Sequence, residues 1–259
     1  YYTQGINPLK ISDVYRDIRY IIQNNFNGQV VTNAWLKIYE IINRFELIKK
    51  STNLNKVKVF CNAELPGAFI CAINHYIHTL SHNVEFDWVG SSLYPSKGGI
   101  LGDTYGIYEN NKNKWLMNEK MKGDITKVKD IKKLVQKVKK KLNGEVDIYT
   151  SDAGINVSDD YTKQEELTAH INLGQIVTGL MVLRNGGSFI VKTFTFNHPF
   201  SISLIGICAT LFEEFKIVKP VTSRPANSEV YLVGIGFKGI SQEIINKKKL
   251  HTVCEEASC

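Results

Sequence analysis

Residues 144–154 read GEVDIYTSDAG, and they join a short apolar run to an acidic residue at its end. Val146–Thr150 is rich in β-branched and aromatic residues, which predicts a β-strand. Asp152 follows that run and precedes the small residues Ala153 and Gly154. Because ligands of open α/β sheets bind outside the carboxyl ends of the strands, Asp152 is a candidate functional residue. The alternative is a carboxylate that only caps a turn or a helix.

Predicted strands and helices alternate on both sides of this run. In chain order, the pattern predicts helices over 11–24 and 31–49, a strand over Val57–Cys61, a helix to about Leu80, a strand over Val84–Val89, an irregular stretch over 91–123, a helix over 127–142, a strand over Val146–Thr150, a helix over 163–184, a strand over Ser188–Phe194, a helix over 200–212, strands over Phe215–Val218 and Val230–Phe237, and a helix over 241–250.

This alternation predicts an α/β fold with a mostly parallel sheet and helices on both faces. No helix separates the last two predicted strands, which favours an antiparallel edge strand. We expect a single domain overall. Residues 51–259 would form its core, and residues 1–50 would form an N-terminal helical extension that packs on that core.

The composition excludes several classes of protein. With 43% hydrophobic and 22% charged residues, the chain is neither disordered, nor collagen-like, nor a disulfide scaffold. No apolar run approaches the roughly 18 residues of a membrane span. The first residues have neither the basic start nor the apolar core of a signal peptide. The five cysteines are odd in number and form no C-x-x-C pair. We therefore expect a protein of the cytoplasm that is not secreted and contacts no membrane.

The net charge of +7 is concentrated in one segment. Residues 127–141 contain eight Lys and one Asp, and removing them from 32 basic and 25 acidic residues leaves 24 of each. Val128, Ile131, Leu134, Val135, Val138 and Leu142 form the apolar side of this predicted helix. The lysines are therefore interpreted either as a solvated outer face or as a contact for an RNA tail or a partner.

Two charged residues stand in or beside predicted strands. Lys192 lies inside the apolar run Ile190–Phe194, and burying a lysine is costly unless the lysine is paired. Glu229 opens the last apolar strand and could neutralise such a lysine. The alternatives are a lysine that reaches solvent from an edge strand and an exposed strand start.

The segment after the first strand, Asn62–Phe69, offers small residues and the free N–H groups of a helix N-terminus. It contains neither G-x-G-x-x-G nor G-x-x-x-x-G-K-[ST], so a phosphate-cradling loop is not predicted. An ordinary turn between strand and helix is the alternative.

Together these residues resemble the FtsJ-like family of S-adenosylmethionine-dependent RNA ribose 2'-O-methyltransferases. That family carries a Lys-Asp-Lys-Glu tetrad, and the matching residues are Lys37 in NAWLKIYE (33–40), Asp152, Lys192 and Glu229. The resemblance covers roughly residues 33–240 and is nearest to the Adrift-type cap methyltransferases. The matching stretches are ELPGAFICAINHY (64–76), DWVGSSLYP (87–95), GDI (123–125), GGSFIVKTFT (186–195) and KPVTSRPANSEVYLV (219–233).

The resemblance implies a Rossmann-like methyltransferase fold and transfer of a methyl group to a ribose 2'-hydroxyl near the 5' cap of mRNA. It implies that Lys192 takes the hydroxyl proton, that Lys37 and Asp152 orient that hydroxyl, and that Glu229 holds the lysines. No metal is needed. The expected partners are 5'-capped RNA and the capping or transcription machinery. The expected source is a large DNA virus that encodes its own capping enzymes, such as African swine fever virus. The alternatives are 2'-O-methylation of other RNA and an inactive RNA-binding subunit.

The resemblance also implies a site for S-adenosylmethionine. The residues that would bind it are Glu64, Pro66, Gly67, Ala68, Phe69, Trp88, Asp124 and Asp152. The loop departs from the common family pattern at Cys61, Ala63 and Ala68, and no acid ends the second strand, where Trp88 and Ser91 stand. Asp124 has a second interpretation, as a cap of the helix over 127–142.

Two further groups of residues are candidates for ligand binding. Tyr94, Tyr105 and Tyr108, or else Tyr1 and Tyr2, are candidates to stack on a methylated guanine. Cys71, His75, His78 and His82 fall on one face of a predicted helix. A single straight helix cannot wrap four ligands around a zinc ion, so a polar helix face is the favoured interpretation.

Overall fold

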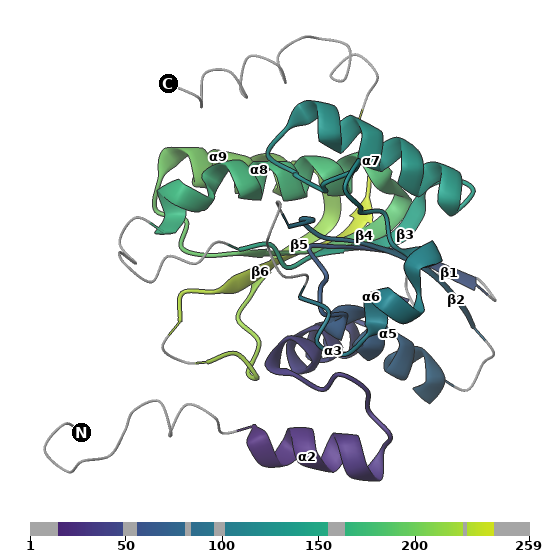
Figure 1. Cartoon of the computed structure of the whole chain (residues 1–259). Coiled ribbons are helices and arrows are strands. Elements are labelled where there is room, and N and C mark those ends of the chain that lie inside the picture. The colour runs from purple at the N-terminus through teal and green to yellow at the C-terminus, as the bar shows by residue number, and fades with distance from the viewer. Residues whose placement is uncertain are drawn as a thin grey trace, which may run out of the picture.

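The computed structural model describes residues 15–48, 56–80, 84–95, 102–154, 164–224 and 227–240. Its centre is one six-stranded sheet with helices on both faces, as predicted (Figure 1). The elements are α2 (Arg16–Asn25), α3 (Asn33–Phe45), β1 (Lys56–Asn62), α5 (Ala68–Thr79), β2 (Glu85–Ser91), α6 (Ile107–Asn110), η2 (Lys112–Lys114), α7 (Val128–Lys141), β3 (Val146–Ser151), α8 (Gln164–Val182), β4 (Leu183–Thr193), α9 (Pro199–Leu211), β5 (Phe212–Val218) and β6 (Val230–Phe237).

The strand order is β2-β1-β3-β4-β6-β5. The first four strands of this order are parallel, whereas β6 runs antiparallel to both β4 and β5. The predicted antiparallel end of the sheet is therefore present, with β6 inserted between β4 and the edge strand β5. Because Thr193 pairs with Val230, the start of β6 lies beside the carboxyl end of β4. This arrangement places Glu229 at the carboxyl ends of β3 and β4, where Asp152 and Lys192 are expected.

Several element boundaries and one stretch predicted as irregular differ from the prediction. β4 starts at Leu183, directly after α8, because Leu183 pairs with Val146 ahead of a register shift in β3. β5 starts at Phe212, where the ladder with Phe237 begins. The stretch predicted as irregular contains the short helices α6 and η2. The predicted helix over 241–250 lies outside the described residues.

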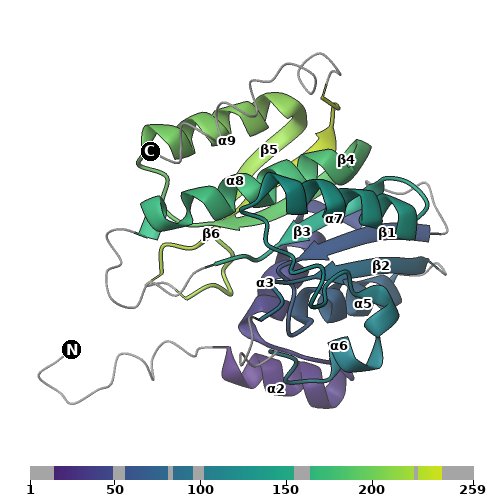
Figure 2. The same cartoon turned by 45° about the horizontal axis from the view of Figure 1, so that its top comes forward.

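Two apolar clusters hold the layers together, one on each side of the sheet. Helices α3 and α5 lie on one face, and α7, α8 and α9 lie on the other (Figures 1 and 2). Trp35, Ile38 and Ile41 of α3 belong to the same buried cluster as Val57 of β1. Thr32 accepts a hydrogen bond from the Trp35 amide and caps α3. The division of the chain at residue 50 stays a prediction, because the structure does not describe residues 49–55.

Helix α7 shows how one sequence pattern becomes two surfaces. Ile131, Leu134, Val135 and Val138 are buried, whereas Lys133, Lys137 and Lys140 are exposed. The amphipathic interpretation of this helix is therefore confirmed, and its contact with RNA stays a prediction. Within the described part of the chain, no helix is both long and apolar enough to span a bilayer.

Gly174 provides a test of how tightly α8 is packed. A Cβ atom added there would lie 1.9 Å from the carbonyl oxygen of Ile125. We expect Gly174→Ala to lower the free energy of unfolding by about 1–3 kcal/mol, because the backbone must move. Gly206→Ala in α9 is the control, since no atom lies within 4 Å of its added Cβ, and it should be neutral or slightly stabilising. Equal effects in denaturant unfolding would contradict this account.

Candidate active site

The four tetrad residues lie together as two ion pairs. Lys37 Nζ lies 2.5 Å from Glu229 Oε1, and Lys192 Nζ lies 3.1 Å from Asp152 Oδ1. The four side chains expose between 10% and 23% of their surface. The charges of Lys192, Glu229 and Lys37 all act on the pKa of Asp152, so the two pairs lie close to each other. The structure thus brings together residues that are up to 192 positions apart in the chain.

The first pair joins α3 to the loop before β6. Ser223 Oγ donates a second hydrogen bond to Glu229 Oε1, at 3.2 Å. Lys219 Nζ donates to the backbone oxygens of Glu229 and Asn227, at 3.0 and 2.6 Å. The carboxylate that neutralises Lys37 is therefore held through its side chain and through its backbone.

Glu40 attaches the same loop to α3. Its carboxylate accepts hydrogen bonds from the Val221 amide at 2.8 Å, from the Thr222 amide at 3.1 Å and from the Thr222 hydroxyl at 2.8 Å. Glu40 lies one helical turn after Lys37, so both side chains leave the same side of α3. One helix consequently supplies the lysine and also holds the loop that carries its partner.

The second pair lies between neighbouring parallel strands. Asp152 follows β3 directly, and Lys192 is the penultimate residue of β4. Lys192 Nζ also donates to the backbone oxygen of Asp152 at 2.9 Å, and the Tyr231 hydroxyl donates to Asp152 Oδ1 at 3.2 Å. A Cβ atom on Gly154 would lie 3.3 Å from Lys192 Nζ, so the backbone of Gly154 packs close to the lysine.

Burial and neighbouring charges shift the acids of the site. Burial raises the pKa of the Asp152 carboxyl; Lys192 and Lys37 lower that pKa and Glu229 raises it, and the net shift is upward. Burial also raises the pKa of the Tyr231 hydroxyl, and the charges of Asp152 and Glu229 raise it further. Burial is the largest cause of both shifts, so the centre of the site disfavours an unpaired negative charge.

Glu64 lies at the start of α5, beside this cluster. Its Oε1 accepts hydrogen bonds from the Phe69 amide at 2.8 Å and the Ile70 amide at 3.0 Å. Burial raises the pKa of Glu64 well above its usual range, and the charge of Asp152 adds to that shift. Gly67 begins the helix with a φ of 107°, a conformation that favours glycine. Pro66 and the buried Ala68 complete this turn.

A cationic ligand fits these residues. Glu64 and Asp152 come from different strand ends, and burial together with a neighbouring acid raises the pKa of each carboxyl. A ligand with an ammonium or sulfonium group would relieve their repulsion, because an opposite charge favours the ionised carboxylate. The chemistry of this pair of acids therefore suits the expected cofactor.

The other two residues expected to bind the cofactor are placed differently. Trp88 lies inside β2 with its ring 6.2 Å from the Trp115 ring, as part of an aromatic cluster. Asp124 accepts hydrogen bonds from the amide and hydroxyl of Thr126 and pairs with Lys127 at 2.7 Å. Burial acts to raise the pKa of Asp124, but these partners hold it below its usual range. Among the described residues, neither Trp88 nor Asp124 bonds to Glu64 or Asp152.

The structure also bears on two other predictions, Asp124 as the cap of α7 and a polar face on α5. Lys127, not Asp124, is the residue directly before α7, so Asp124 closes the preceding turn instead of capping the helix. Cys71 is buried and His75 packs against the rings of Trp35 and Tyr39, whereas His78 is exposed, so the predicted polar face is only partly exposed to solvent. In the described ranges no group of three or more His, Cys, Asp or Glu side chains could hold a metal ion, and His82 lies outside those ranges.

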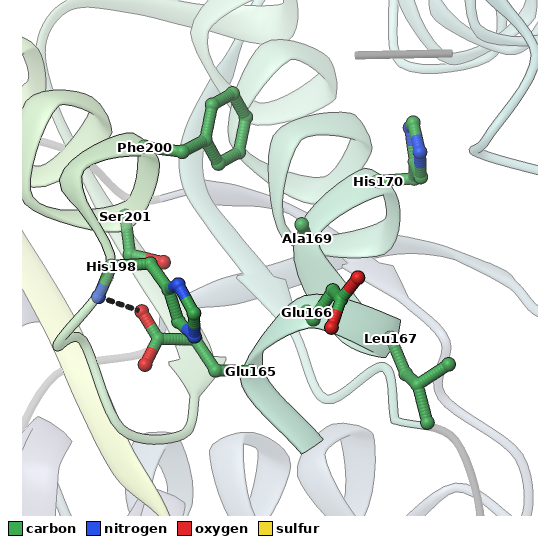
Figure 3. A pocket seen from close by; sticks show the side chains of 8 residues that line it. All are labelled: Glu165, Glu166, Leu167, Ala169, His170, His198, Phe200 and Ser201. Atoms are coloured by element: carbon green, nitrogen blue, oxygen red, sulfur yellow. Dashed lines mark hydrogen bonds between the residues drawn. The ribbon is translucent and has the colours of Figure 1, made fainter. Parts of the chain in front are cut away.

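A pocket of about 610 Å³ lies between the starts of α8 and α9 (Figure 3). Glu165 is buried beside it and accepts hydrogen bonds from the amides of Asn197 and His198, at 2.9 and 2.8 Å. Glu165 thereby holds the segment that follows β4. The predicted site residues do not line this pocket in the part of the chain that is described.

Sequence reasoning missed the residues that hold the tetrad in place. Glu40, Lys219, Ser223 and Tyr231 each contact a tetrad residue or the loop that carries one, yet no role is predicted for them. Lys219 was detectable in principle, because it follows directly on a strand as Asp152 does. Glu40 had no such signal, since it looks like an ordinary acid on the polar side of an amphipathic helix.

The raised pKa of Glu64 predicts a pH-dependent difference in stability. Folding raises this pKa, so the stability contributed by protonated Glu64 is complete below the unfolded value of about 4.3 and is lost as pH rises through the folded value. Glu64→Gln keeps an acceptor for α5 but does not titrate. We expect the stability of the variant relative to wild type to rise by up to about 1.4 kcal/mol per pH unit within that window. Thermal unfolding at pH 5 and pH 8.5 measures this, and a constant difference would contradict the assignment.

Comparison with known proteins agrees with the geometry. The model of the family described as FtsJ-like methyltransferase matches residues 30–237. A probable methyltransferase of African swine fever virus, EP424R, is 45% identical over 231 residues, which are 86% of this chain and 53% of that protein. The cap-specific mRNA (nucleoside-2'-O-)-methyltransferase 2 of Drosophila melanogaster is 30% identical over 228 residues, 85% of this chain and 32% of that protein.

The chain thus spans about half the length of the viral relative and about a third of the fly relative. Among solved structures, a putative ribosomal RNA methyltransferase from Plasmodium falciparum superposes with a TM-score of 0.56 at 18% identity. That superposition covers 81% of this chain and 99% of the other. It supports the Rossmann-like methyltransferase fold.

Proposed function

Because the chain belongs to the FtsJ-like methyltransferase family, we propose that it transfers a methyl group from S-adenosylmethionine to a ribose 2'-hydroxyl of capped mRNA. The observation that carries this proposal is the pairing of Lys192 with Asp152 beside the pair of Lys37 with Glu229. The family supports methyl transfer, and the fly relative's name supports the 5' end of mRNA as substrate. Contact with the capping machinery and a cytoplasmic location remain predictions.

S-adenosylmethionine would supply the methyl group on a positively charged sulfur atom. Glu64 and Asp152 are the acids proposed to face this cation, and Pro66–Phe69 form the turn proposed to hold it. Trp88 and Asp124 stay predicted cofactor residues, with the aromatic cluster and the turn before α7 as their observed surroundings.

The protein's own part in the reaction is to orient the ribose and to receive a proton. A hydroxyl is a poor nucleophile until its proton leaves. Lys192 Nζ would accept the proton of a 2'-hydroxyl bound beside it once the ammonium of its pair with Asp152 has itself lost a proton to become the neutral amine. Asp152 and Lys37 orient that hydroxyl, and Glu229 keeps Lys37 in position through the 2.5 Å contact. These contacts would present the hydroxyl oxygen to the methyl group that a bound cofactor supplies, and the bond from that methyl group to sulfur would break as the new bond to oxygen forms.

Substitution of Lys192 tests this assignment. We expect Lys192→Ala to abolish methyl transfer while leaving the affinity for S-adenosylmethionine within a few-fold, because Lys192 acts on the hydroxyl. Lys192→Arg should also be inactive, since a guanidinium does not accept a proton at neutral pH. Radiolabel transfer and calorimetric titration measure the two quantities. Equal loss of both would indicate misfolding, and an active Arg variant would contradict the role as proton acceptor.

The choice of substrate needs its own experiment. Wild-type protein is incubated with cap-0, cap-1 and uncapped RNA of one sequence, and nuclease mapping locates the methyl group. Transfer to the first or second transcribed nucleotide of capped RNA only supports the proposal. Transfer to uncapped RNA at the same rate would indicate another RNA substrate. RNA binding without transfer would indicate an inactive subunit.

A further inference from the structure

Helix α8 carries a line of buried polar side chains on the side that faces β3 and β4. Thr168, Asn172, Gln175 and Thr178 are all buried, and they follow one another at helical spacing. Buried polar groups are costly unless they are hydrogen-bonded. These buried side chains therefore need hydrogen-bond partners, and the identity of those partners indicates the role of the side chains.

Gln175 has partners on both catalytic segments. Its Oε1 accepts a hydrogen bond from the Ala153 amide at 3.1 Å, and its Nε2 donates to the Lys192 carbonyl at 3.1 Å. The same Nε2 donates to Asn172 Oδ1 at 3.1 Å, which orients the amide group. One fully buried side chain thus spans from the residue after Asp152 to the backbone of Lys192.

This bridge lies just beyond the point where the sheet itself holds the two segments. The ladder between β3 and β4 has Ser151 and Val191 as its last pair. Ala153 and Lys192 lie past that pair, where no strand pairing fixes their separation. A primary amide can accept from an N–H and donate to a carbonyl at the same time, which no aliphatic or carboxylate side chain does.

We propose that Gln175 is a positioning residue that sets the separation of Asp152 and Lys192. It acts on their backbones and touches neither reacting side chain. The inference rests on the proposed methyl transfer. An error of about 1 Å in the placement of a reacting group can cost on the order of 100-fold in rate. Loss of the bridge should therefore lower the rate of the chemical step far more than it lowers binding.

The test compares Gln175→Met with Thr178→Val in the full chain. Met has a similar length but neither bonds Ala153 nor donates to Lys192. Thr178 is buried one turn later, and its hydroxyl donates only within α8, to the Gly174 carbonyl at 2.7 Å. We expect Gln175→Met to lower kcat by about 10- to 100-fold, with KM for capped RNA within twofold of wild type. Thr178→Val should keep kcat within twofold.

A second measurement does not depend on activity. The Ala153 amide should exchange with solvent faster in Gln175→Met than in wild type or Thr178→Val, as hydrogen exchange followed by NMR would show. Gln175→Leu, which lacks both the acceptor for Ala153 and the donor for Lys192, serves if the Met variant does not fold. It should lose kcat and speed exchange of the Ala153 amide in the same way.

The outcomes distinguish failure of the proposed methyl transfer from failure of the proposed role of Gln175. Absence of methyl transfer by wild type on every RNA tested would contradict the proposed function. Transfer by wild type with a Gln175 variant that matches Thr178→Val in kcat and in Ala153 exchange would overturn the positioning role. A matched fall in thermal stability and kcat for both substitutions would reduce Gln175 to a purely structural residue.

Discussion

Charged groups that are withdrawn from water must neutralise one another, and the architecture of this site follows from that constraint. Removing one member of a buried ion pair commonly costs about 3–5 kcal/mol, because the other charge is left unpaired. Here two lysines and two acids form two pairs at the carboxyl ends of β3 and β4. Their side chains come from a helix, a strand end, a strand interior and a loop. All four charges are therefore paired only in an arrangement that keeps those four segments together.

Each pair is maintained by a helix from a different layer. On one face of the sheet, α3 supplies Lys37 and holds the loop of Glu229 through Glu40 (Figure 1). On the other face, α8 reaches the backbones beside Asp152 and Lys192 through Gln175. The helical layers thus do more than cover the sheet. They also set the geometry of the tetrad side chains at the carboxyl ends of the strands, so the packing of the helices determines the geometry of the site.

The order of strands and helices and the positions of Asp152, Lys192 and Glu229 leave local marks in the sequence, whereas Lys37 was predicted only from the resemblance to the family. A strand pattern ends before Asp152, surrounds Lys192 and begins after Glu229. The supporting residues leave no such marks. Glu40 meets Thr222 across 182 positions through a loop whose course no periodicity reveals. Gln175 sits in a helix whose buried side is partly polar, so the usual division into apolar and polar faces does not identify it. The early start of β4 depends on a register shift between β3 and β4, and such a shift is visible only once the strands are paired.

The reversed direction of β6 has a consequence for the biosynthesis of the protein. A ribosome releases Lys37 early and Glu229 late, and 191 residues separate them. A nascent chain that ends before Glu229 already contains Lys37 and the segments of β1 to β4, but it lacks the carboxylate with which Lys37 pairs. The final pairing of β6 with β4 therefore does two things at once: it inserts the strand that links the sheet to β5, and it delivers the missing counter-ion. Assembly of the site coincides with completion of the sheet.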